Sequence, residues 1–111
     1  MSDSSNNPRE RIEGMWRREH EFFCYMRKIG VSLIYLRQGV SGKFKLRRGC
    51  YTPDFYDETH RVYYEVAGSR QALQVGTPKY REMKIKYPHI VLKIVRPDGT
   101  EIDISKERRK Q

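Results

Sequence analysis

Two β-strands are predicted side by side in YTPDFYDETHRVYYEVAG, residues 51–68. Residues 51–57 and 61–67 are rich in aromatic and β-branched residues, which favour strands, and DETH (57–60) between them is typical of a turn. Gly68 then ends the second strand. The segment therefore predicts a hairpin, and the rest of the fold is built around it.

Each strand of this hairpin carries a carboxylate. Side chains alternate along a strand, so Glu65 shares one face with Tyr63 and Ala67 in a segment that reads as largely buried. Asp54 lies in the preceding strand, where it could face Glu65 near one end of the sheet. Inward oxygen ligands from separate elements form a hard-cation site, typical of Mg²⁺, which could activate a water molecule and neutralise a phosphorane.

A third carboxylate stands out in the helix predicted over residues 9–29. The apolar residues of this helix recur at three- and four-residue steps, and Glu19 falls in the middle of that stripe. A carboxylate aimed into a core is costly unless it is paired or binds a metal. Two interpretations stay open: an inward Glu19 that serves a site, or a Glu19 at the rim that forms a salt bridge with an arginine.

The remaining elements follow from the same patterns. Strands are predicted over 31–37, 43–48, 90–95 and 100–104, and a helix over 78–87, with Thr77 as its N-cap and Pro78 as its first residue. The order α-β-β-β-α-β-β predicts an α/β fold around a mixed sheet. We expect a single domain over 9–105, between a flexible tail at 1–8 and a basic tail at 106–111.

The charge composition indicates which class of partner the protein would bind. The 23 Lys and Arg residues against 14 Asp and Glu residues leave a formal charge of +9, which favours a polyanion, with nucleic acid as the first candidate. No apolar run approaches the length of a membrane span, and the first residues do not resemble a signal peptide. The two cysteines form no pair of metal-site spacing. These features predict a protein of a reducing compartment such as the cytoplasm, with no membrane partner.

The residues that carry the carboxylates match a known pattern. YTPDFYD followed by YYEVAG resembles the PD-(D/E)XK nuclease superfamily, in particular its small very-short-patch-repair-like, phage and homing-type endonucleases. The opening WRREHEFFCYMRKIG resembles the first helix of that family, whose acidic residue falls on Glu19. The likeness spans roughly residues 9–96 and implies a restriction-endonuclease-like α-β-β-β-α-β core.

The resemblance also implies roles for these residues. Mg²⁺, or Mn²⁺ in its place, would be bound by Asp54, Glu65 and Val66, and Glu19 would hold a second metal or orient a metal-bound water. The substrate would be DNA, expected as a duplex. Cutting both strands from a single active site would then need a homodimer or larger assembly, or two separate visits, unless the enzyme is a nickase.

The chain departs from the family pattern at one position. The family usually has E-x-K in this strand, where the lysine polarises the water and holds the scissile phosphate; here Ala67 replaces that lysine. Gln71 is the first candidate for the moved role and Arg70 the second, and Lys79 and Tyr80 could also reach the site. Each of these four could equally be an ordinary surface or helix residue.

Two functions therefore compete. The first is a Mg²⁺-dependent endonuclease with Glu19, Asp54, Glu65 and Gln71 as catalytic residues. The second is a nuclease-like nucleic-acid-binding module without cleavage, and an RNA-cleaving or structural protein is a weaker third. In either of the first two, cations would follow the phosphate backbone. The residues expected to do so are Lys43, Lys45, Arg47, Arg48, Arg70 and Lys79.

Overall fold

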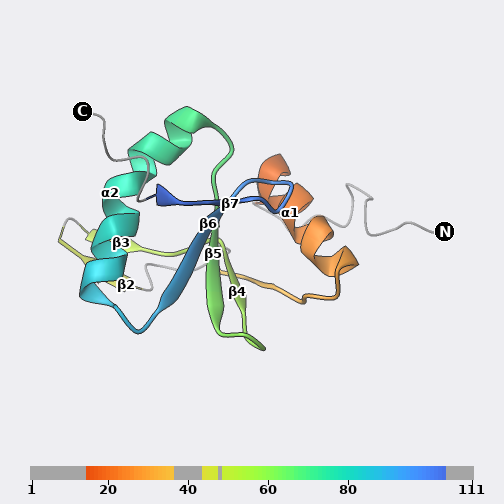
Figure 1. Ribbon diagram of the computed structural model, residues 1–111, viewed down its shortest axis with the longest axis horizontal. Coiled ribbons are helices and arrows are strands. Elements are labelled where there is room, and N and C mark those ends of the chain that lie inside the picture. Colours follow the sequence, from red (N-terminus) through yellow and green to blue (C-terminus); the bar gives the residue numbers. More distant parts are fainter. Residues whose placement is uncertain (1–14, 37–43, 48, 105–111) are drawn as a thin grey trace.

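The computed structural model describes residues 15–36, 44–47 and 49–104. Two helices and seven strands are found in these ranges (Figure 1). In chain order they are α1 (Arg17–Lys28), β1 (Ile34–Tyr35), β2 (Phe44–Leu46), β3 (Gly49–Tyr51), β4 (Phe55–Asp57), β5 (Val62–Val66), α2 (Arg70–Lys86), β6 (Val91–Val95) and β7 (Glu101–Ile102).

Five of the strands form one mixed sheet in the order β1-β4-β5-β6-β7. Strands β1, β4 and β5 make an antiparallel meander, β5 and β6 pair in parallel, and β7 returns antiparallel to β6. A parallel pair needs a crossover connection, and α2 provides it between β5 and β6. The prediction of an α/β fold with a mixed central sheet flanked by helices is confirmed.

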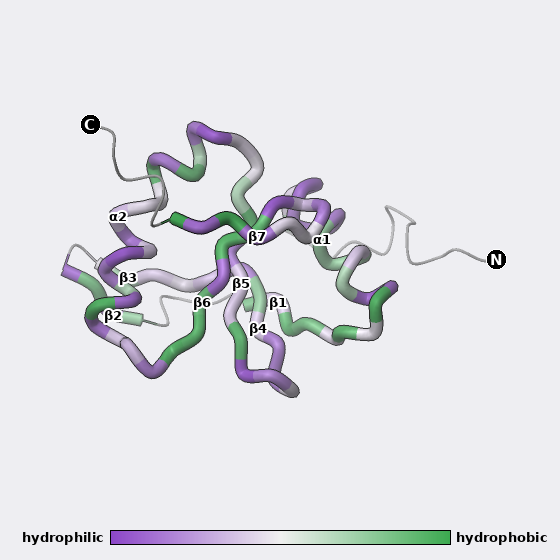
Figure 2. Tube along the Cα trace, in the orientation of Figure 1, coloured by the Kyte–Doolittle hydropathy of each residue, from purple (hydrophilic) through white to green (hydrophobic). Residues whose placement is uncertain are grey.

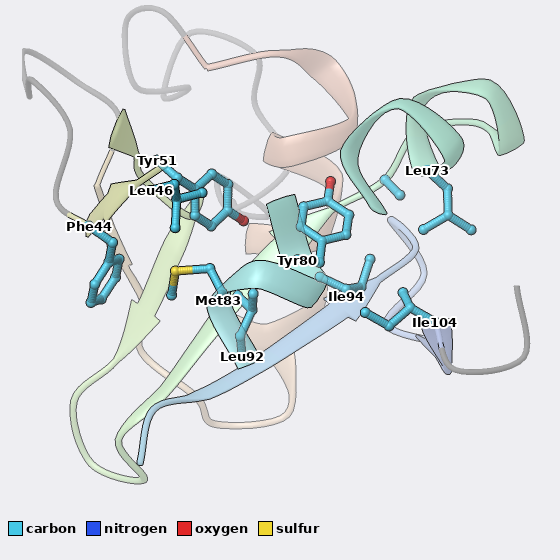
Figure 3. Close-up of a cluster of buried hydrophobic side chains, with 10 residues drawn as sticks. Phe44, Leu46, Tyr51, Leu73, Tyr80, Met83, Leu92, Ile94 and Ile104 are labelled. Atoms are coloured by element: carbon cyan, nitrogen blue, oxygen red, sulfur yellow. The ribbon is translucent and has the colours of Figure 1, made fainter. Parts of the chain in front are cut away.

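The two helices pack on opposite faces of the sheet (Figure 1). On the α1 face, Phe22 and Phe55 lie at the centre of a buried cluster that also contains Val66. Hydrophobic residues dominate β6, whereas both helices alternate between hydrophobic and hydrophilic positions, as expected for elements covered on one side (Figure 2). On the α2 face, Met83 and Ile94 belong to a second cluster, which includes residues of the separate β2–β3 hairpin (Figure 3).

The predicted start of the second helix was wrong. Helix α2 begins at Arg70 rather than at residue 78, because Ser69 caps it by accepting the Ala72 backbone N–H at 3.1 Å. Pro78 therefore lies inside the helix, and Thr77 is not a cap: its hydroxyl donates to the Leu73 carbonyl oxygen at 2.7 Å. The extra turns matter for the site, since they place the first half of α2 beside the carboxyl end of β5.

Other boundaries also differ from the prediction. Residues 15 and 16 precede α1 rather than belonging to it, because the Glu19 side chain accepts the Trp16 backbone N–H in a helix-start contact. The strand predicted over 51–57 is interrupted at 52–54, which separates β3 from β4. Strand β1 is much shorter than 31–37. The alternation predicted for 43–48 is confirmed in its described part, with Phe44 and Leu46 buried and Lys45 and Arg47 exposed.

Some of the predicted segments and residues are not described by the structure. The two predicted tails, most of the first turns of the predicted opening helix, Lys43 and Arg48 are not among the described residues. Neither helix of the described part is both long and apolar enough to cross a membrane.

Candidate active site

The three carboxylates singled out by the sequence line one pocket of about 500 Å³. Glu19 comes from the first turn of α1, Asp54 from the bend before β4, and Glu65 from β5. The first half of α2 forms the opposite wall. Residues that are distant in sequence are thus brought together where the antiparallel meander meets the crossover helix.

Asp54 is held rigidly at the floor of this pocket. Its side chain is 1% exposed, and its Oδ2 accepts the Val66 backbone N–H at 2.8 Å. Its own backbone carbonyl accepts the Leu36 N–H at 2.9 Å, which ties the bend to the strand on the other side. Asp54 therefore lies just before β4, rather than within a strand as predicted, and its carboxylate is oriented by the last residue of β5.

The backbone of Val66 also belongs to this floor. The β4–β5 register pairs Phe55 with Tyr64, and extending it by two residues places Val66 opposite Pro53. Proline has no N–H, so Pro53 cannot donate to the Val66 carbonyl oxygen as an ordinary ladder residue would. Val66 lines the same pocket as the two carboxylates, and the family resemblance implies its carbonyl as a third oxygen ligand.

Glu65 is bracketed by two phenols. Tyr51 donates its hydroxyl to Glu65 Oε1 at 2.8 Å, and Tyr80 donates to Oε2 at 3.4 Å. Burial, followed by the negative charge of Glu65, raises the pKa of the Tyr51 phenol well above its ordinary value, and the charge of Asp54 contributes in the same direction. The charges of Asp54 and Glu65 therefore both act on the Tyr51 phenol.

Glu19 is buried, with only 3% of its surface exposed. Its Oε1 accepts the Trp16 backbone N–H at 2.9 Å and the Tyr35 hydroxyl at 3.0 Å. In the described part of the chain these are its partners, rather than the arginine that a rim position would have used. The inward alternative is the one that the structure supports; helix periodicity identified Glu19 but left both alternatives open.

Three of the four candidates for the role of the missing lysine line the pocket, and one does not. Gln71 and Lys79 line the pocket, and so does Tyr80, whereas Arg70 does not. Ala67 itself is 5% exposed and lies in the hydrophobic cluster on the α2 face. The site of the family lysine is thus enclosed by apolar neighbours, while polar side chains approach the carboxylates from α2.

Among the pocket residues that sequence reasoning missed, two have side chains suited to binding a ligand. Trp16 and Arg18 both line the pocket, at the start of α1. Periodicity assigned neither of them to the apolar stripe, and only the packing of α1 against the end of β5 brings them to the site. The glycine at position 68 was a usable signal, because a Cβ there would overlap the Arg18 side chain.

Of the described cations predicted to follow DNA, only Lys79 lines the pocket. Lys45 and Arg47 are exposed on and just after β2, and neither lines the pocket. The Arg47 backbone N–H donates to Glu82 Oε2 at 2.6 Å, and Tyr87 donates to the Lys45 carbonyl oxygen at 3.0 Å, so the hairpin is fastened to the second half of α2. These cations are presented beside the helix whose first half forms the pocket wall.

The donor set suits a divalent cation that needs few protein ligands. Among the described residues, no three His, Cys, Asp or Glu side chains gather closely enough to hold a metal. Two carboxylates and one backbone carbonyl remain, and all are hard oxygen donors. Because Mg²⁺ commonly keeps several waters and uses only one or two protein carboxylates, Asp54, Glu65 and Val66 fit this ion rather than one that needs a full protein cage.

Comparison with known proteins adds no assignment: no family model, curated protein or solved structure matches the chain. Inference about function therefore rests on the site and on the sequence pattern.

Proposed function

We propose that this protein is a metal-dependent endonuclease that hydrolyses phosphodiester bonds of DNA. The observation that supports this best is the convergence of Glu19, Asp54 and Glu65, from three separate elements, on one pocket of a protein with a formal charge of +9. Glu19 and Asp54 are buried, and a buried carboxylate is costly unless it is hydrogen-bonded, paired or bound to a metal. A pocket of hard oxygen donors inside a cationic molecule suits a cation-assisted reaction on a polyanion.

Each residue has a distinct task in this proposal. Asp54, Glu65 and the Val66 carbonyl would hold Mg²⁺ or Mn²⁺, which supplies a more acidic water and a positive charge near the phosphate. Glu19 would accept a hydrogen bond from the attacking water, since its carboxylate faces the same pocket. Gln71 would orient that water through its amide, which can both donate and accept.

Cations outside the carboxylate cluster would position the substrate. Lys79 lines the pocket and would contact a phosphate next to the cleaved bond. Lys45 and Arg47, exposed on the hairpin beside α2, would contact the backbone further away. These contacts carry no base information, so they predict binding that depends on salt more than on sequence.

A second function has a specific observation in its favour. Ala67 lies among apolar side chains and can neither polarise a water molecule nor hold a phosphate. A domain that kept the nuclease architecture but lost cleavage would be a nucleic-acid-binding module. The presence of all three carboxylates in the pocket argues for the enzyme, because a binding module gains nothing from negative charge at the DNA-facing pocket.

Cleavage of supercoiled plasmid in Mg²⁺ or Mn²⁺ tests the proposal. We expect nicked or linear product from the wild-type protein, and none when Mg²⁺ is replaced by a chelator. Asp54→Asn and Glu65→Gln should abolish cleavage while leaving the thermal melting curve close to that of the wild type, since each amide keeps an oxygen acceptor.

Asp57→Asn is the matched control. Asp57 is as buried as Asp54 but lies at the far end of β4, where it accepts the backbone N–H groups of Thr59 and His60. Its variant should cleave like the wild type. If plasmid stays intact with both metals while DNA still binds, the non-cleaving module is the correct assignment.

A further inference from the structure

We propose that Trp16 and Arg18 form a subsite for one unpaired nucleotide of DNA at the entrance of the carboxylate pocket. Trp16 would stack on the base, and Arg18 would contact the adjacent phosphate. This inference rests on the proposed function, because it names the form of the substrate at that site. It goes beyond it by requiring single-stranded character where the sequence suggests only duplex DNA.

Trp16 is placed as a stacking surface. Its side chain is 64% exposed, although large aromatic side chains are usually well buried, and it lines the pocket that contains Glu19. It is the N-cap residue of α1, and its backbone N–H is bonded to Glu19 Oε1. The exposed ring is therefore attached to the same turn of helix that positions the Glu19 carboxylate.

Arg18 supplies the charge beside this ring. Its guanidinium carbon lies 5.5 Å from the centre of the Trp16 ring, which is a cation–π distance. Its Nε is buried and has no hydrogen-bond partner within the described part of the chain. The Arg18 side chain also passes so close to Gly68 that no Cβ would fit there, which holds it at the end of β5. A guanidinium held in this way has donors available for a phosphate oxygen.

The two side chains together fit a nucleotide better than an isolated base or phosphate. A base stacked on Trp16 has its phosphate within reach of a neighbouring cation, and the carboxylates lie further inside the same pocket. Bases of an intact duplex are already stacked on their neighbours, so an exposed indole favours a strand whose base is free. The pocket therefore selects an unpaired nucleotide next to the bond that is cut.

Intrinsic fluorescence provides a direct test, because Trp16 is the only tryptophan of the chain. The full-length protein is titrated in a chelator, so that cleavage cannot occur, with oligo(dT), an abasic strand of equal length, oligo(U), and a blunt duplex. We expect strong quenching by oligo(dT) and little by the abasic strand or the duplex. Equal quenching by the abasic strand or by the duplex would overturn the subsite, and tighter binding of oligo(U) would overturn its assignment to DNA.

Variants extend the test to affinity, measured by the anisotropy of labelled oligo(dT). Trp16→Ala should weaken binding of the single strand roughly 5- to 100-fold, the range for loss of one stacked base. Trp16→Phe should retain most of the affinity, and duplex binding should be unchanged in both. Ile85→Ala, which removes an even more exposed apolar side chain of α2 that does not line the pocket, is the control.

The outcomes separate this inference from the nuclease proposal. Quenching by oligo(dT) in a protein that cleaves neither plasmid nor oligo(dT) in Mg²⁺ or Mn²⁺ would support the subsite and contradict the enzyme. Plasmid cleavage by Trp16→Ala at the wild-type rate, together with unchanged oligo(dT) affinity, would contradict the subsite and leave the enzyme standing.

Discussion

Asp54 and Val66 are joined by a hydrogen bond in which Asp54 Oδ2 accepts the Val66 backbone N–H at 2.8 Å. This bond connects the bend before β4 to the last residue of β5, at the position where the β4–β5 register reaches Pro53. The Asp54 side chain thus accepts a backbone N–H of β5 that a neighbouring strand would otherwise accept. The same bond aims the Asp54 carboxylate at the strand that carries Glu65, so stability and site geometry depend on one residue.

The first prediction separates these two roles of Asp54. Asp54→Asn keeps an oxygen that can accept the Val66 N–H, whereas Asp54→Ala leaves that buried donor unsatisfied. We expect Ala to lower the free energy of unfolding by about 1–3 kcal/mol more than Asn does, measured by urea denaturation. Both variants should lack cleavage. Equal stability of the two would show that the Val66 bond contributes little to the fold.

The second prediction concerns alkaline pH. Burial and the charge of Glu65 raise the pKa of Tyr51 in the folded protein, and burial also raises the pKa of Tyr63 and Tyr64. The unfolded chain therefore loses these protons first, so stability is fully present below about pH 10 and falls above it.

Urea denaturation at a series of alkaline pH values measures this slope. The buried Tyr51 can contribute up to about 1.4 kcal/mol per pH unit, whereas the partly exposed Tyr63 and Tyr64 contribute less because solvent screens their charges. Tyr51→Phe should make the decline shallower, while lowering stability at neutral pH through loss of the 2.8 Å bond to Glu65. An identical decline in the variant would rule out Tyr51 as a main source.

The third prediction uses a glycine in α2. Replacing glycine by alanine inside a helix usually stabilises it by about 1 kcal/mol. At Gly76, however, the new Cβ would overlap the hydroxyl and ring of Tyr80, which donates to Glu65 Oε2. Gly76→Ala should therefore bring no gain in melting temperature and should lower plasmid cleavage.

Tyr80→Phe is the companion variant for that experiment. It removes the hydroxyl without pushing the ring, so its cleavage rate should fall less than that of Gly76→Ala. A Gly76→Ala protein that is more stable and fully active would mean that Tyr80 does not need its present position.

The fourth prediction concerns the group that stands in for the missing lysine. Gln71 lines the pocket and can orient a water, so Gln71→Ala should lower turnover about 10- to 100-fold with little change in DNA affinity. Single-turnover cleavage and anisotropy together measure both quantities. Wild-type turnover in this variant would transfer the role to Lys79.

Ala67→Lys tests the same question from the other side. Ala67 is buried among apolar side chains, so the lysine should lower the free energy of unfolding by about 1–3 kcal/mol. If its ammonium reaches Glu65, cleavage should exceed that of Ala67→Met, which fills similar space without charge. Equal rates in the two variants would mean that this position does not present a lysine to the carboxylates.

The fifth prediction concerns Lys45 and Arg47, which are exposed on the hairpin, together with Lys43, which lies outside the described residues. Neutralising Lys43, Lys45 and Arg47 should flatten the dependence of log Kd on log salt by about 0.9 for each duplex phosphate that the variant no longer binds. A matched control neutralises Lys28, Lys93 and Arg96, which removes the same charge from other elements. If the control lowers the slope as much as the hairpin variant does, overall charge rather than a backbone track governs binding.

Local patterns indicated the three carboxylates that line the pocket. The period-two alternation of residues 61–67 assigned Glu65 to the face of Ala67, and the helical period placed Glu19 among apolar residues. Both assignments depend only on where a side chain points from its own element. The α/β architecture could be predicted from the order of elements, because that order restricts how the elements can be layered.

Tertiary structure alone decided which of these residues meet and what surrounds them. Helix α2 starts at Arg70 because the Ser69 side chain caps it. The helix continues through Pro78 because packing against the sheet outweighs the local helix-breaking effect of proline. The phenol of Tyr51 reaches Glu65, and Trp16 and Arg18 reach the pocket, only because β3 and α1 pack beside β5. Such contacts join residues far apart in sequence, and no periodicity within one element carries information about its partner.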